Sequence, residues 1–323
     1  EVGGDFAAQL SANRRGEARL SALVAKTGLD AFLGAIAEIN DYAERLARAT
    51  LRAIPPGDYR FDDVMDDDGA GTTEVRLSCI LRVDHNGIEV DLEGCADQVA
   101  GNTNCPPAVA AAAVFYAFRC LLPANTPACA GTFRVVRLRT RPGSIVNAAR
   151  PAAVAAGNVE TSMRLVDVVL GALAQALPGR IPAASQGTMN NVAMGDHAIN
   201  QPWDYYETIG GGAGGHADAP GRSALQSHMT NTLNTPIESL ELHYPLRILE
   251  YSLRRGSGGA GQKRGGDGIV REFEFLSPAE VTLLTERRKS RPWGLAGGHP
   301  GAAGRNLLDG ETLPPKVAFK ASP

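Results

Sequence analysis

Side chains that could bind and polarise a carbonyl group are concentrated in the middle of the sequence. Between residues 155 and 238 the chain contains the blocks AAGNVETS, ASQGTMNN, YYETIGGGAGG and SHMTNTLNTPIE. Carboxamides, hydroxyls and carboxylates cost free energy when they are buried without hydrogen-bond partners, so folding alone does not favour such clusters. We therefore predict that these four blocks line one cleft.

The first block, which contains Asn158 and Glu160, stands at the start of a predicted helix over residues 160–177. Asn158 suits a helix cap, and Glu160 is favoured there by the helix dipole. The same first turn exposes backbone N–H groups that could hold a carbonyl or carboxylate of a substrate. The sequence leaves both interpretations open.

The last block places a base or metal ligand, a hydroxyl and a carboxamide within four residues, His228, Thr230 and Asn231. The alternative is a structural role, in which Thr232 and Thr235 only cap and turn the chain before Pro236. We favour a role in the cleft.

Several other motifs do not predict a dinucleotide, calcium or metal site. Residues 210–215 and 256–261 match G-x-G-x-x-G, but no helical sequence follows either of them, as a dinucleotide site requires. We interpret them as loops in which backbone must approach backbone or a ligand. The acidic run 66–68 lacks the spaced ligands of a calcium loop, which predicts a solvated turn. No pair of histidines has metal-site spacing, so we assign no metal ligand to this sequence.

Composition narrows the class of protein. The 323 residues are 44% hydrophobic and 21% charged, with a formal net charge of -3, which is typical of a globular protein and disfavours nucleic acid as a partner. No apolar run reaches the roughly twenty residues of a membrane span. The five cysteines include no C-x-x-C pair, which predicts free thiols and a cytoplasmic location.

The order of predicted elements indicates an α+β fold. Residues 5–54 are predicted to be helical, with a short apolar stripe that stops at Gly28 and a longer one from Leu29 to Ile54 that ends at two prolines. This predicts an antiparallel helical hairpin as a first domain, residues 1–56. Residues 57–323 then form an α+β cleft region with largely antiparallel sheets and glycine-rich loops. We expect a hairpin around His85, Asn86 and Gly87, and strands over residues 132–140, 205–209, 240–254, 270–276 and 281–285.

Taken together, the blocks resemble the carboxy-terminal half of the hydantoinase B/oxoprolinase large-subunit family. The resemblance runs in order along nearly the whole chain. It is carried by Asn104-Cys105-Pro106, Pro151, the stretches 155–162 and 184–191, Tyr206-Glu207-Thr208-Ile209, the glycines 210–212, His228-Met229-Thr230-Asn231-Thr232, Asn234-Thr235-Pro236-Ile237-Glu238, the segments 258–261 and 264–266, and Pro292-Trp293-Gly294.

This resemblance implies part of an ATP-dependent hydrolase that opens cyclic amides such as hydantoins or 5-oxoproline. The family pairs this large subunit with an actin-like A-type subunit that holds ATP and Mg, and a divalent metal completes the chemistry by activating a water. On that basis the candidate catalytic residues are His228 and Glu160. The candidate substrate-binding residues, which would orient the ring and stabilise an oxyanion, are Asn158, Thr161, Gln186, Asn190, Asn191, Thr230 and Asn231.

Two other functions stay open. One is a subunit of an ATP-dependent ketone carboxylase of the acetone or acetophenone type, and the other is a non-catalytic scaffold for the ATP-binding subunit. The family's metal-binding stretch lies upstream of the segment matching residues 1–4. We therefore expect few or no metal ligands here, a hetero-oligomer that includes an amino-terminal half of the same subunit, and no activity from this piece alone.

Overall fold

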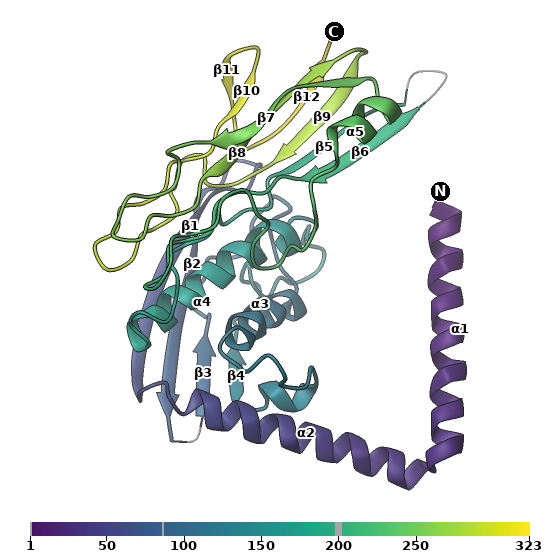
Figure 1. Ribbon diagram of the computed structural model, residues 1–323, viewed down its shortest axis with the longest axis vertical. Helices are drawn as coiled ribbons and strands as arrows, with labels where there is room; N and C mark the ends of the chain where they lie inside the picture. Colours follow the sequence, from purple (N-terminus) through teal and green to yellow (C-terminus); the bar gives the residue numbers. More distant parts are fainter. Residues whose placement is uncertain (1, 86, 198–201) are drawn as a thin grey trace. The chain divides into compact units, whose positions relative to one another are not determined.

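The computed structural model describes residues 2–85, 87–197 and 202–323. The chain divides into two compact units, one made of Glu1–Ala53 and Leu122–Val135, the other of Ile54–Leu121 and Val136–Pro323. The described residues form helices and mostly antiparallel sheets that do not alternate strictly along the chain, which confirms the predicted α+β class (Figure 1).

The first unit begins with two long helices, α1 (Val2–Thr27) and α2 (Leu29–Leu51). Gly28 separates them at a φ of 83°, and the chain turns there by 105°, so the helices meet at a corner (Figure 1). The predicted antiparallel arrangement is wrong because such a reversal needs a loop of about 2–5 residues, whereas one glycine stands here. Among the described residues no single helix is long and apolar enough to cross a membrane; α1 and α2 reach that size only when joined across their bend.

A short 3₁₀ turn, Ala130–Phe133, packs against α2. The Gly131 N–H donates to Asn40 Oδ1 over 2.7 Å, and a Cβ on Gly131 would lie 2.0 Å from the Asn40 carbonyl oxygen. Because this turn is fixed on α2, the strand predicted from residue 132 begins only at Val136.

The second unit opens with a four-stranded sheet in the order β1-β2-β3-β4, antiparallel except for the parallel pair β3–β4. Its strands are β1 Gly57–Asp67, β2 Thr73–Asp84, β3 Gly87–Asp91 and β4 Val136–Arg139. The predicted hairpin between β2 and β3 is confirmed by their antiparallel register, although its central residue, Asn86, lies outside the described residues.

Two helices, α3 (Pro107–Arg119) and α4 (Ser162–Ala176), pack against each other. The longer one, α4, also packs on β1 and β2. At the closest approach, a Cβ on Gly171 would lie 2.6 Å from the Phe61 ring. A π-helical turn, Gly157–Thr161, leads into α4, so the predicted helix start at residue 160 falls inside that turn. Such turns are often found at functional sites.

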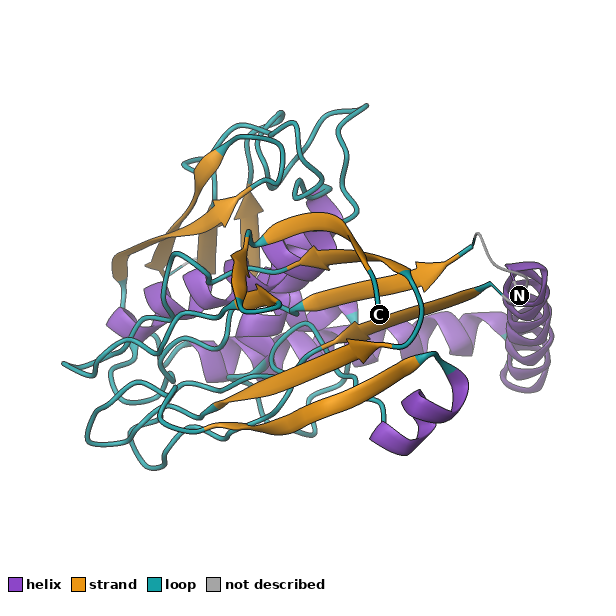
Figure 2. Cartoon of the chain, turned by 90° about the horizontal axis from the view of Figure 1, so that it is seen from above, coloured by secondary structure: helices purple, strands orange, loops and turns teal. Residues whose placement is uncertain are grey.

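A second sheet has the order β12-β9-β5-β6 and is antiparallel throughout. Figure 2 shows the strands of the chain in orange and its helices in purple. The elements of this region are β5 Asn191–Asp196, β6 Trp203–Thr208, α5 Ile237–His243, β7 Leu246–Arg254, β8 Gly268–Phe275, β9 Ala279–Leu284, β10 Asn306–Leu308, β11 Glu311–Leu313 and β12 Lys316–Ala321. The predicted strand 240–254 is wrong over its first residues, because Leu240 is buried on α5 in the core that includes Trp203 and Leu246. All five cysteines are free thiols, as predicted.

Candidate functional site

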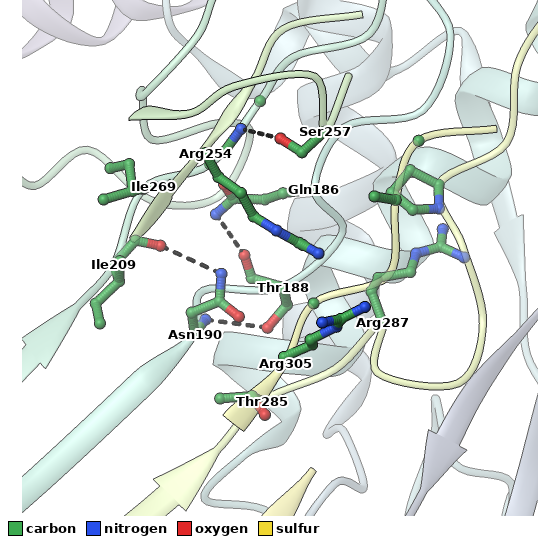
Figure 3. A pocket seen from close by; sticks show the side chains of 18 of the residues that line it. Gln186, Thr188, Asn190, Ile209, Arg254, Ser257, Ile269, Thr285, Arg287 and Arg305 are labelled. Atoms are coloured by element: carbon green, nitrogen blue, oxygen red, sulfur yellow. Dashed lines mark hydrogen bonds between the residues drawn. The ribbon is translucent and has the colours of Figure 1, made fainter. Parts of the chain in front are cut away.

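A cavity of about 1410 Å³ lies in the second unit. Its walls come from β5, β7, β8, β9 and β12 and from glycine-rich segments around residues 210–215, 256–266 and 292–304 (Figure 3). Typical small-molecule sites measure about 300–1,000 Å³. A small ligand would therefore occupy one part of this cavity.

The glycine segments form the wall because their backbones touch one another. A Cβ on Gly212 would lie 2.1 Å from the Gly266 carbonyl oxygen, and one on Gly214 would lie 1.9 Å from the Ala183 carbonyl oxygen. The Gly266 N–H also donates to the Ala213 carbonyl oxygen over 2.9 Å. The predicted role of these glycines in close backbone approach is confirmed.

Three predicted substrate-binding residues line the cavity: Gln186, Asn190 and Asn191. Gln186 donates from Nε2 to the Thr188 carbonyl oxygen over 2.7 Å, while its buried Oε1 has no partner among the described residues. Asn190 has a φ of 51°, a left-handed conformation that asparagine tolerates better than most residues. The two side chains bring carboxamides to the same wall, together with the Thr188 hydroxyl (Figure 3).

Glu160 lies behind this wall and is fully buried. Its Oε1 accepts hydrogen bonds from Asn191 Nδ2 over 2.7 Å and from the Met189 N–H over 3.1 Å. Burial raises the pKa of Glu160 to about 8, and the charge of Glu286 acts in the same direction. Glu160 is thus neutral at pH 7 and reaches the cavity through Asn191.

His228 does not line the cavity but pairs with a buried carboxylate of α4. Its Nε2 lies 3.0 Å from Asp167 Oδ1, and the Tyr116 ring meets it edge-on with centroids 5.7 Å apart. Asp167 also accepts from the Ser185 N–H over 3.1 Å. Burial opposes ionisation of Asp167, but its contacts with His228, the charge of Arg287 and the Ser185 N–H together outweigh it, and the pKa of Asp167 is lowered.

The other predicted residues lie elsewhere. Asn158 and Asn231 are exposed and Thr230 is half-buried, and none of the three lines the cavity. Thr161 is buried and donates to the Thr103 carbonyl oxygen. Capping by Asn158 is also wrong, since the π-helical turn begins after Ala156 without a side-chain cap. These residues therefore do not join Gln186, Asn190 and Asn191 in the wall of this cavity, and their role in a cleft stays a prediction.

Arginines of the cavity wall were missed by the sequence analysis. Arg254, Arg271, Arg287, Arg288 and Arg305 all line it. Arg288 donates from Nη1 to Asn190 Oδ1 and from Nη2 to Asn306 Oδ1, each over 2.7 Å. Burial lowers the pKa of Arg288 to about 10, so it is charged at neutral pH. No local pattern joins residues so far apart, although the basic pairs 254–255 and 287–288 are visible in the sequence.

A buried ionic network lies next to the wall. Arg164 donates from Nη2 to Glu286 Oε2 over 3.2 Å, and Arg287 donates from Nη2 to Asp63 Oδ2 over 2.6 Å. Asp66 is 2% exposed and accepts from the backbone N–H groups of residues 288–290. The solvated turn predicted at residues 66–68 is wrong because partners more than 200 residues away enclose this carboxylate.

Among the described residues no three His, Cys, Asp or Glu side chains are grouped so that they could hold a metal ion. The described residues therefore offer no ligand set that fits the divalent metal that the family resemblance implies. We assign no step of the chemistry to a metal held by these residues alone.

The family is established by comparison with known proteins. Residues 1–322 match the family model described as Hydantoinase B/oxoprolinase, and the chain belongs to this family. It is 37% identical over 318 residues to 5-oxoprolinase 1 of Arabidopsis thaliana, covering 94% of this chain and 24% of that protein. It is 30% identical over 323 residues to a Pseudomonas protein named as the B-type subunit of a putative D-/L-hydantoinase, covering 96% of this chain and 54% of that protein.

Solved structures share the fold. The ATP-dependent caprolactamase from Pseudomonas jessenii superposes with a TM-score of 0.84 at 27% identity, covering 99% of this chain and 58% of that one. An acetone carboxylase superposes with a TM-score of 0.73 at 19% identity, covering 88% of this chain and 41% of that one, which shows likeness of fold alone. The chain thus spans about a quarter of the 5-oxoprolinase and about half of the hydantoinase subunit.

Proposed function

We propose that this chain is part of the large subunit of an ATP-dependent hydrolase that opens cyclic amides. The observation that carries the proposal is the family match over residues 1–322. Relatives at 30% identity or more are named as a 5-oxoprolinase and as part of a hydantoinase, and a structural neighbour is named as a caprolactamase. All three names denote opening of a ring amide.

The cavity wall suits a cyclic amide. An amide within such a ring presents an N–H donor and a carbonyl acceptor, and a buried polar site rejects ligands that leave its groups unpaired. Gln186 Oε1 is buried without a partner among the described residues and packs against Gly211, where a Cβ would lie 1.9 Å from it. The Asn190 carboxamide, whose Nδ2 makes only a 3.4 Å contact with the Ile209 carbonyl oxygen, can donate to the ring carbonyl.

Proton transfer by His228 and Glu160 stays a prediction. Neither side chain lines the cavity formed by the described residues. Glu160 would act on the ring through Asn191, and His228 through Asp167 and Ser185. Within the described part of the chain, Asn158, Thr161, Thr230 and Asn231 have no bond to the cavity that would support a role in binding the ring.

ATP and Mg would be bound by an actin-like A-type partner, in a cytoplasmic hetero-oligomer. A divalent metal would supply activated water, with ligands from outside this chain. The proposal concerns the whole protein, since the chain spans only part of the relatives that it matches.

The test is ATP-dependent turnover by the complete complex with 5-oxoproline, a hydantoin and caprolactam, each with and without bicarbonate. We expect ADP release coupled to ring opening and independent of bicarbonate. Turnover of acetone or acetophenone only in the presence of bicarbonate would instead establish a carboxylase. A complex whose turnover is unaffected by substitutions throughout the cavity would indicate that this chain is a scaffold.

A further inference from the structure

The cavity wall carries more positive charge than the rest of the chain. Five arginines and two lysines line it, against four carboxylates, in a chain with a formal net charge of -3. Clefts lined by one sign of charge concentrate ligands of the opposite sign. The ligand of this wall is therefore expected to be an anion.

Three of these arginines lack a carboxylate partner. Among the described residues Arg254, Arg288 and Arg305 form no ion pair, whereas Arg271 pairs with Glu207 and Arg287 with Asp63. Arg254 donates from Nη1 to the Ala303 carbonyl oxygen over 2.7 Å, and Arg288 bonds to the neutral side chains described above. Neutral oxygens satisfy these N–H groups, and the carboxylates that act on the charge of Arg288, Asp66 and Glu286 among them, lie outside ion-pair contact with it.

The three side chains share one part of the cavity. Arg254 ends β7, Arg288 follows β9 and Arg305 precedes β10, and Arg254 and Arg305 reach toward the same space (Figure 3). Burial lowers the pKa of Arg254, and the charge of Arg305 lowers it further. A Cβ on Gly304 would lie 2.6 Å from Arg288 Nη1, so the glycine next to Arg305 leaves room for the Arg288 guanidinium.

Other residues of the cavity lining have buried polar atoms without a hydrogen-bond partner among the described residues. Among the described lining residues they include four donors, namely Arg271 Nε and Nη1, Arg287 Nε and Trp293 Nε1, and one acceptor, Gln186 Oε1. Buried polar groups in native proteins nearly always have partners. The Arg271 guanidinium stacks on the Tyr251 ring at 4.3 Å from its centroid, so these donors belong to the paired arginines and Trp293 and the proposal below does not depend on them.

We propose that Arg254, Arg288 and Arg305 form a binding site for the phosphoryl group of a ligand. One bidentate arginine is sufficient for a carboxylate, whereas a phosphoryl group offers three acceptor oxygens and a charge of about -2. Three converging guanidinium groups match the larger anion. The site deepens the proposed function and rests on it only for the identity of the ligand, a phosphorylated substrate or the phosphate released from it.

Inorganic phosphate is the probe for this site, titrated calorimetrically into the complete complex at low ionic strength, with acetate in a parallel titration. Arg305→Gln removes an exposed side chain and should leave the melting temperature unchanged while it weakens phosphate binding at least about tenfold. Arg254→Gln should have a similar effect, and Arg254→Lys should restore part of the affinity because it keeps the charge.

The matched control is Arg255→Gln, at an exposed arginine next to Arg254 that does not line the cavity. It should bind phosphate within about twofold of the wild type, because the net charge changes equally but the site is intact. The proposal is overturned if wild-type protein does not bind phosphate, if acetate binds as tightly, or if Arg305→Gln and Arg254→Gln leave phosphate affinity unchanged. A complex that binds phosphate through these arginines but opens no cyclic amide would overturn only the proposed function.

Discussion

Two groups of arginines in the second unit differ in the groups that accept their hydrogen bonds. In the buried network, Arg164 and Arg287 face carboxylates supplied by the chain itself, at 3.2 Å from Glu286 and 2.6 Å from Asp63. In the cavity wall, Arg254 and Arg288 bond only to neutral oxygens among the described residues. The carboxylates of the network come from the chain itself, whereas Arg254 and Arg288 have no carboxylate within ion-pair distance among the described residues.

The two groups of arginines contain residues that are adjacent in the sequence. Arg287 joins the network and Arg288 joins the wall, and Arg287 has a φ of 62°, an uncommon conformation for a side chain of its size. Asp66 fixes the following backbone by accepting from the N–H groups of Arg288 over 2.6 Å and Ser290 over 2.8 Å. The folding network thus orients a residue of the proposed binding site, which explains why the two regions adjoin.

The largest effect is expected from breaking the network. Arg164→Ala removes a side chain that is fully buried and leaves Glu286 without one of its positive partners. Breaking a buried ion pair from one side typically costs about 3–5 kcal/mol, and we expect a loss of this size in the free energy of unfolding, measured with urea. The control is Arg76→Ala, whose pair with Asp62 is exposed at 58% and 51% and whose loss should be far smaller.

A second large effect concerns Glu160, which lies between the network and the wall. Because burial raises its pKa from 4.5 to about 8, the folded protein holds this proton more tightly than the unfolded chain does. Glu160 therefore destabilises the fold increasingly as the pH rises from 4.5 to about 8. In Glu160→Gln, whose amide oxygen can keep the bonds to Asn191 and Met189, this penalty is absent.

Unfolding measured across that pH range should show Glu160→Gln gaining on the wild type by up to about 1.4 kcal/mol for each pH unit, then levelling off. A stability difference that does not change with pH would show that Glu160 titrates normally. Activity measurements on Glu160→Gln address a second question, whether Glu160 positions Asn191 or carries a proton. A large fall in kcat with no change in pH profile fits positioning through Asn191, whereas loss of one limb of the pH profile would make Glu160 the proton carrier.

A smaller effect tests whether the glycine segments support the wall. Gly212→Ala would place a Cβ 2.1 Å from the Gly266 carbonyl oxygen, and a backbone atom cannot move aside as a side chain does. Such overpacking costs about 1–3 kcal/mol, which thermal unfolding would detect. The control is Gly261→Ala, where the nearest atom, Gly298 Cα, lies 3.5 Å away; equal destabilisation by both variants would contradict the argument.

Local signals in the sequence were sufficient for the elements that depend on neighbours. Alternation on either side of residue 86 predicted the pairing of β2 with β3, and two prolines predicted the end of the first helical region near Leu51. The π turn before α4 escaped prediction because residues 157–161 have the composition of an ordinary capped start. Its geometry depends on packing at Gly157, where a Cβ would lie 2.0 Å from the Asn104 carbonyl oxygen.

The candidate site was predictable only where one continuous block enters the cavity, as Gln186, Asn190 and Asn191 do. Polar composition could not separate these residues from Asn231, because exposure depends on distant packing. It also gave no sign that Asp66 is enclosed by residues 288–290. Arginines 254, 288 and 305 lie next to three different strands. Periodicity in a single sequence does not predict that residues of different strands lie close together.

The smallest expected effect on stability comes from a comparison of two variants of the complete complex, one at a wall residue and one at an exposed residue. Asn190→Gly keeps the left-handed backbone at φ 51° but removes a carboxamide that faces the cavity and accepts from Arg288. We expect kcat/KM for a cyclic amide to fall by about 10- to 100-fold with little change in melting temperature. Asn231→Ala, at an exposed position outside the wall, should stay within about twofold.

If Asn231→Ala lowers kcat/KM more than Asn190→Gly does, the reaction takes place at the surface around His228 and not in this cavity. Equal and negligible effects from both would favour the scaffold over the enzyme, since neither polar block would then touch a substrate. The expected ranking has one physical reason. A carboxamide that also anchors a charged guanidinium helps to position the wall, whereas an exposed carboxamide exchanges its hydrogen bonds with water and positions nothing.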